Sequence, residues 1–157
     1  MISGLPLPVR ITAIAVLAGS LAGTARAASS GAELYARHCI ACHQAEGEGT
    51  PGIAPPIAGV LAKRAATPEG REFFPRLLLN GMTGSIVSQG IRYNGNMPPV
   101  ANLADAELAA IVNHVLSAFN GSTVQLSPDD FAAARSTPVP PTEVRKQRER
   151  LLAIAGE

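Results

Sequence analysis

The sequence predicts an all-α fold, in which helices alternate with irregular segments rich in glycine and proline. The strongest pattern lies at residues 103–119, where apolar side chains recur three and four residues apart and Asn120-Gly121 supplies a stop signal. No run alternates between apolar and polar residues for long, so strands are not expected. A chain of 157 residues has the size of one domain.

The segment before that helix begins with a second predicted helix at residues 30–42. Ser29 or Ser30 can cap its first turn, and the acidic Glu33 favours the positive end of the helix dipole. Residues 44–59 hold four glycines and three prolines and are expected to form a loop.

The middle of the chain is expected to hold one short helix and a long irregular stretch. Pro75 suits the first position of a helix and Gly81 suits its end, which predicts a helix over residues 75–80. Residues 84–100 are again rich in glycine and proline, and we expect them to be irregular.

The composition changes after Gly121, and we divide the mature chain there into a domain at 28–121 and a tail at 122–157. The tail begins with a short helix over 127–135, which a stiff extended linker at 137–141 follows. Thr142 can cap a final helix that carries a thin apolar stripe and a basic cluster: Val144, Leu151 and Ala155, and Arg145, Lys146, Arg148 and Arg150. Because the stripe is sparse, a solvated and partly frayed tail is favoured over a docking helix.

The first 27 residues have the layout of a secretory signal peptide. Arg10 precedes an almost entirely apolar stretch at 11–22, and Ala25-Arg26-Ala27 places small residues where a signal peptidase reads them. Cleavage is expected after Ala27 or Ala28. The alternative is an uncleaved anchor, but the apolar stretch is shorter than the ~20 residues of a spanning helix.

Cleavage would leave 11 basic and 12 acidic side chains and no apolar run long enough to cross a membrane. The mature protein is therefore expected to be soluble and exported, with the bacterial periplasm as its compartment. The low, balanced charge argues against binding to nucleic acid, which requires a clustered basic surface. Two cysteines are too few for a disulfide scaffold.

The sequence Cys39-Ile40-Ala41-Cys42-His43 is the attachment signature of a c-type haem. Two thiols three residues apart on a helical turn can form thioethers to both vinyl groups of one porphyrin, and His43 then becomes the proximal iron ligand. A zinc site would need four ligands, and no second pair of cysteines exists. A thioredoxin-like thiol pair would need a βαβ setting, which the pattern does not predict.

A six-coordinate electron-transfer haem needs a second axial ligand, for which four side chains remain. We favour Met97, which lies 54 residues after His43 beside the rigid Pro98-Pro99, because a Met/His pair is a common ligand set for the iron of an electron-transfer haem. Met82 is interpreted as a core residue, since methionine commonly fills gaps. We interpret His114 as a packing or surface residue and His38 as a surface residue.

Together these residues resemble the small class I c-type cytochromes with a single haem. The resemblance covers roughly residues 29–121 and is carried by Gly31, Tyr35, the Cys39–His43 motif, Ala54-Pro55-Pro56-Ile57-Ala58-Gly59, Tyr93-Asn94-Gly95-Asn96-Met97-Pro98-Pro99 and the helix 103–119. It implies the small cytochrome c fold, wrapped around one haem bound covalently through Cys39 and Cys42. It further implies that the first and last domain helices cross closely at Gly31, that Tyr35 packs at this crossing, and that the Pro55 carbonyl accepts a hydrogen bond from His43.

Within that family, the runs at 78–84 and 126–131 look most like the cytochromes that accept electrons from periplasmic dehydrogenases. The resemblance implies a one-electron carrier rather than an enzyme, cycling Fe(III)/Fe(II) with His43 and Met97 on the iron. A periplasmic dehydrogenase is the expected donor, and an oxidase or another cytochrome the expected acceptor. A tethered subunit of a dehydrogenase complex is the alternative, and a haem enzyme or sensor with an open distal site is a further one.

Aromatic residues make up only 4% of the chain, although 46% of it is apolar. A bound haem would supply the missing flat apolar bulk. We therefore expect that the chain without haem fails to form a stable core.

Overall fold

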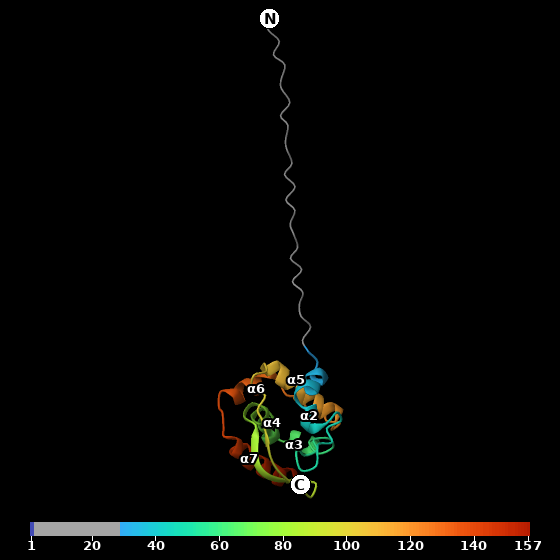
Figure 1. Ribbon diagram of the computed structural model, residues 1–157. Coiled ribbons are helices and arrows are strands. Elements are labelled where there is room, and N and C mark those ends of the chain that lie inside the picture. Colours follow the sequence, from blue (N-terminus) through green and yellow to red (C-terminus); the bar gives the residue numbers. More distant parts are fainter. Residues whose placement is uncertain (2–28) are drawn as a thin grey trace.

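The computed structural model describes Met1 and residues 29–157, and the expected signal segment lies outside the described residues. The described chain folds as a mainly helical body with one two-stranded sheet (Figure 1). No helix in the described part of the chain is both long and apolar enough to span a membrane. The elements are α1 (Gly31–His38), α2 (Ile40–His43), α3 (Ala62–Ala65), α4 (Pro68–Asn80), β1 (Met82–Ser88), β2 (Ile91–Met97), α5 (Asp105–Ala118), α6 (Pro128–Arg135) and α7 (Pro141–Ala155).

Helices α1 and α5 pack directly against each other, and the expected close crossing at Gly31 is confirmed. A Cβ atom on Gly31 would lie only 2.2 Å from the carbonyl oxygen of Ala110 on α5, so glycine alone permits this approach. Tyr35 lies one turn further along α1, is 2% exposed, and packs edge-on to Phe119 at a ring distance of 5.1 Å. The predicted helices at 30–42 and 103–119 are therefore present, the first divided at Cys39 into α1 and α2.

Helix α4 is longer than the sequence pattern predicted. It begins at Pro68, after Thr67, whose side-chain oxygen accepts a hydrogen bond from the Gly70 amide at 3.0 Å. Pro75 lies inside this helix and is buried, so the expectation that it opens a helix over 75–80 is wrong. The Thr67-Pro68 pair is the stronger start signal, because threonine caps the first turn and proline fits its first position.

The expectation that the chain lacks strands is also wrong, because β1 and β2 form an antiparallel hairpin over residues 82–97, most of which falls in the stretch 84–100 that was expected to be irregular. The strands are joined by Gln89 and Gly90, which both have positive φ angles, of 48° and 76°. This is the geometry of a two-residue type I′ turn. The all-α class holds nonetheless, since this small hairpin is an addition to a helical body.

The segment after Gly121 packs on the body instead of fraying into solvent. Phe131 of α6 and Val144 and Leu151 of α7 are fully buried, and α7 lies against α4 and β1. The favoured interpretation of a solvated tail is therefore wrong, because the sparse apolar stripe of α7 is sufficient to pack this helix against α4 and β1. Helix α7 begins at Pro141, one residue before the expected Thr142 cap.

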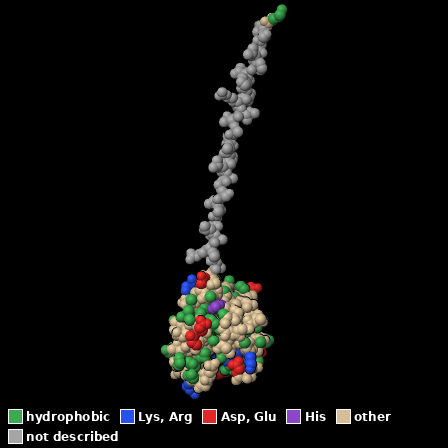
Figure 2. All heavy atoms as spheres, turned by 90° about the vertical axis from the view of Figure 1, so that its right-hand side faces the viewer, with side chains coloured by type: hydrophobic (Ala, Val, Ile, Leu, Met, Phe, Trp, Pro, Cys, Tyr) green, Lys and Arg blue, Asp and Glu red, His purple; other side chains and the backbone are tan. Residues whose placement is uncertain are grey.

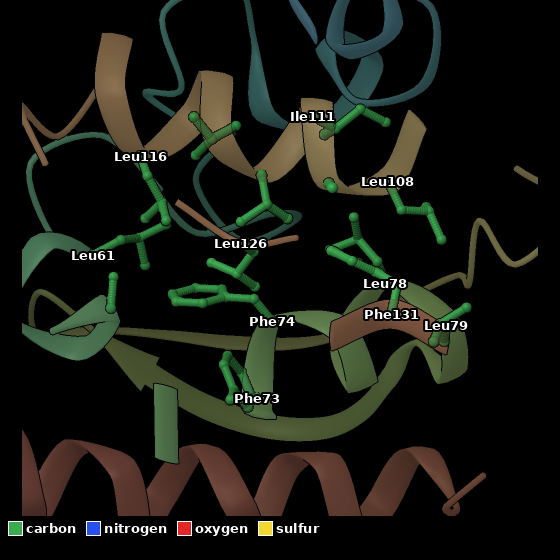
Figure 3. Close-up of a cluster of buried hydrophobic side chains, with 14 of the residues drawn as sticks. Leu61, Phe73, Phe74, Leu78, Leu79, Leu108, Ile111, Leu116, Leu126 and Phe131 are labelled. Carbon is green, nitrogen blue, oxygen red and sulfur yellow. The ribbon is translucent and has the colours of Figure 1, made fainter. Parts of the chain in front are cut away.

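The hydrophobic core lies between α5 and its neighbours, chiefly α4. Buried side chains of α5 face those of α4, with Leu61 and Leu126 completing the cluster (Figure 3). Leu108, Ile111 and Leu116 are each at most 3% exposed, which accounts for the strong apolar periodicity of this helix. One side of the cluster borders a cavity.

Candidate functional site

A single cavity brings together all five residues that the sequence singles out. Cys39, Cys42, His43, Pro55 and Met97 all line it. Most of the other lining side chains are apolar. They come from the segment between α2 and α3, from α4, from the β1–β2 hairpin and from α5: Ile53, Leu61, Phe73, Phe74, Leu77, Leu78, Ile86, Ile111, Val112, Val115 and Leu116. Such walls suit an apolar ligand, and the polar groups that remain are few and specific.

The two cysteines lie where the backbone changes direction. Cys39 ends α1 and also starts α2, with φ −123° and ψ −32°, and its carbonyl accepts the amide of His43 at 2.9 Å. This single turn holds both thiols and the imidazole on one short segment. Cys39 is partly buried, Cys42 is exposed, and no disulfide joins them. Burial, with a smaller contribution from Cys42, raises the pKa of the Cys39 thiol to about 11.

His43 is held by a hydrogen bond to the loop that follows. Its Nδ1 lies 3.1 Å from the carbonyl oxygen of Pro55. Since a carbonyl oxygen only accepts, Nδ1 must carry the proton, which leaves the Nε2 lone pair free to bind a metal. Burial lowers the pKa of His43, and the bond to Pro55 opposes this shift only in part, which favours the neutral imidazole.

Gly49 fixes the position of the Pro55 carbonyl relative to His43. Its φ angle is +74°, and a Cβ atom there would lie 2.6 Å from the Pro55 carbonyl carbon. The Gly49 amide donates to the His43 carbonyl at 3.0 Å, and Thr50 Oγ1 donates to the Cys42 carbonyl at 3.1 Å. The loop is thus fastened to α2 on both sides of the histidine.

Two methionines line the cavity, not only the predicted one. Met97 ends β2, and Met82 begins β1; both are partly exposed and packed against the core. Each thioether sulfur is a soft ligand suited to iron in a haem. Within residues 29–157, no three His, Cys, Asp or Glu side chains are grouped as a metal site of their own would require.

The two other histidines lie outside the centre of the site. His114 packs between Tyr35 and Phe119, at ring distances of 5.9 and 5.1 Å, and does not line the cavity. His38 is exposed and lies at the cavity wall.

Two arginines that were not predicted as site residues also line the cavity. Arg64 and Arg148 are 8% and 6% exposed, although arginine is rarely buried so deeply. A signal for Arg148 was present: it lies four residues after Val144 and three before Leu151, so it shares their buried face. Arg64 gives no comparable signal, because α3 is too short for a periodic pattern.

Comparison with known proteins yields one family model and closely related cytochromes. The family model described as Cytochrome c matches residues 28–119, more than half of the chain. A Cytochrome c-552 of Thermus thermophilus is 38% identical over 136 residues, which cover 83% of this chain and 91% of that protein. A second Cytochrome c-552 of Thermus thermophilus is 37% identical over 128 residues, covering 78% of this chain and 97% of that protein.

Proposed function

Since the chain belongs to the cytochrome c family, we propose that it is an exported, periplasmic electron carrier whose one haem has His43 and Met97 as axial ligands. Family membership makes it an electron-transfer cytochrome with covalently attached haem c. The single observation that carries the proposed haem attachment and axial ligands is the convergence of Cys39, Cys42, His43 and Met97 on one apolar cavity. The proposed export is supported by the signal-peptide layout of the first 27 residues.

The haem supplies a one-electron Fe(III)/Fe(II) couple when bound, and the protein residues set its environment. The hydrogen bond from His43 Nδ1 to Pro55 fixes the tautomer and the orientation of the imidazole, and burial favours its neutral form. A thioether ligand such as Met97 favours the ferrous state relative to a second histidine, and the apolar walls disfavour the extra charge of the ferric state. Both effects raise the reduction potential.

The partners that we propose are a periplasmic dehydrogenase as donor and an oxidase or another cytochrome as acceptor. Ile53 is 64% exposed and also lines the cavity, as does Pro98. These side chains offer an apolar docking surface beside the cofactor site. Residues 28–121 hold six basic and seven acidic side chains, and the face seen in Figure 2 shows the two charges scattered, so we expect weak electrostatic steering.

The runner-up, a subunit tethered through the tail, receives no support from α7. Its stripe residues Val144 and Leu151 are both 0% exposed and already packed within the chain. A docking helix would need that stripe free for the partner. We therefore do not propose tethering through α7.

Expression of the full chain with a haem-attachment system tests the proposal. We expect export, an intact mass raised by one haem, a reversible one-electron titration and a reduced protein that does not bind CO. Rapid CO binding would instead identify a haem enzyme or sensor with an open distal site. A mass without haem, with both thiols alkylatable, would overturn the proposal altogether.

A further inference from the structure

Two buried arginines from distant parts of the sequence meet the same cavity. Arg64 comes from α3 and Arg148 from α7, and both line the wall of the proposed haem site. Arg148 Nη2 donates to the Val87 carbonyl at 3.0 Å; in the described part of the chain, no residue accepts from its Nε or Nη1. Arg64 Nε lies 3.2 Å from Glu157, and no described residue accepts from Nη1 of Arg64.

The charges of this pair are incompletely balanced by the described protein. Glu157 forms an ion pair with Arg64, whereas no carboxylate among residues 29–157 forms one with Arg148. Burial, followed by the nearby Arg64 charge, lowers the pKa of the Arg148 guanidinium. Two buried like charges are costly unless an anion compensates them. A cavity with apolar walls and two cations among its lining residues therefore suits an apolar ligand that carries carboxylates.

Haem has this combination of features, because its apolar porphyrin carries two propionate groups. Guanidinium groups bind carboxylates through paired, charge-assisted hydrogen bonds. We propose that Arg64 and Arg148 bind the haem propionates, so that α7 forms a wall of the cofactor site. This inference rests on the proposed function, since it requires the haem.

The packing of α7 explains how Arg148 reaches the site. Val144 and Leu151, on either side of Arg148 along the helix, are fully buried against the body. The bond from Arg148 to Val87 links α7 to β1, the strand that begins at Met82. The tail thus adds a cofactor contact to the family domain matched at 28–119.

The test measures the reduction potential of the holoprotein against pH in the wild type and in R148Q. An arginine beside a propionate keeps it ionised well below the ordinary carboxyl pKa of about 4.3, so the wild-type potential stays flat above that pH. In R148Q the propionate pKa rises. Because ferric iron favours the ionised propionate, the reduction potential of R148Q then falls as the pH rises through this higher propionate pKa. At neutral pH it lies below the wild-type value, since one nearby positive charge is lost.

The matched control is R150Q, which removes the same charge from an exposed position on the same helix. R150Q should keep the flat wild-type profile, and R148K should restore most of it. Glu149, Glu157 and Arg92 are the other charged groups near Arg148, so E149Q and E157Q are measured to exclude their titration.

Each outcome decides the inference. A flat R148Q profile that matches R150Q, in a protein with intact haem spectra, overturns it without touching the proposed function. If R148Q does not fold, infrared spectra of the wild type decide: propionates that protonate at the ordinary carboxyl pKa contradict the inference, and ionised ones below it support it. A wild type without haem would instead overturn the proposed function.

Discussion

Met82 and Met97 are direct cross-strand partners at the open end of the β1–β2 hairpin, and both line the haem cavity. Directly opposed residues of an antiparallel pair project from the same face of the sheet. The hairpin therefore offers two thioethers to one site. Pro98 and Pro99 stiffen the chain after Met97, and the Val100 amide donates to the Leu78 carbonyl at 2.8 Å, which fixes the segment after Met97 to the end of α4.

We predict that M97A and M82L distinguish the methionine that binds the iron from the methionine that only lines the cavity. Met97→Ala should remove the weak long-wavelength sulfur-to-iron band of the ferric protein and let the ferrous protein bind CO. Met82→Leu should keep the band, because leucine conserves the apolar volume while removing only sulfur. Absorption spectra of both variants provide the measurement. If M82L loses the band and M97A keeps it, the assignment of the ligand is reversed.

The α1–α5 crossing gives a second prediction, on stability. Gly31→Ala would place a methyl group 2.2 Å from the Ala110 carbonyl oxygen and 2.9 Å from His114 Cβ, so the helices must separate. Such overpacking typically costs about 1–3 kcal/mol in the free energy of unfolding. Guanidinium chloride unfolding of the holoprotein measures the loss.

Ala32→Val is the matched control for this change. Position 32 is exposed on the same helix, so added bulk there meets no neighbour on α5. A32V should lower the free energy of unfolding by no more than about 0.7 kcal/mol, which is the cost of the lower helix propensity of valine. Equal destabilisation by both variants would contradict the close-packing explanation.

The sequence predicts α5 and the cofactor motif well, because each follows from a local pattern. The periodic stripe from Leu108 to Leu116 specifies one buried face, and the Cys39–His43 motif specifies its own chemistry. The placement of these elements around one cavity depends on the resemblance to a family. Residue patterns alone do not bring Met97 to His43.

The hairpin was missed for a physical reason. Its strands are rich in Gly, Ser, Thr and Asn, and Ile86 and Tyr93, which pair with each other, are the buried apolar residues in them. Its turn uses Gln89-Gly90 instead of the Asn-Gly or Asp-Gly that usually marks a type I′ turn. The sequence of the hairpin therefore shows neither a clear alternation of apolar and polar residues nor the usual turn dipeptide.

The packing of α7 gives a third prediction, in which two apolar residues of one helix behave differently. Leu151 is 0% exposed and Ile154 is 52% exposed. Leu151→Ala should lower the free energy of unfolding by about 2–5 kcal/mol, as expected for a buried leucine. Ile154→Ala should be nearly neutral. Denaturant unfolding of both variants measures the contrast, and a neutral L151A would show that α7 does not contribute to the folded core.

The pH dependence of stability gives a fourth prediction, which concerns Tyr35. Its buried phenol donates a hydrogen bond to the Gln44 carbonyl at 2.7 Å, and burial is the main cause that raises its pKa above the ordinary value. The unfolded chain, by contrast, loses this proton near pH 10, so at higher pH the folded state binds more protons than the unfolded state. The contribution of Tyr35 to stability is therefore complete below about pH 10 and is lost as the pH rises further.

Tyr35→Phe should cost about 1 kcal/mol at pH 8, where only the hydrogen bond is lost. Because phenylalanine does not ionise, the deficit of the variant should shrink between about pH 10 and pH 11 and can reverse in sign. Denaturant unfolding of both proteins, measured by circular dichroism at each pH, gives the difference directly. A deficit that stays constant, or grows, over this interval would contradict the raised pKa of Tyr35 as the source of the alkaline loss.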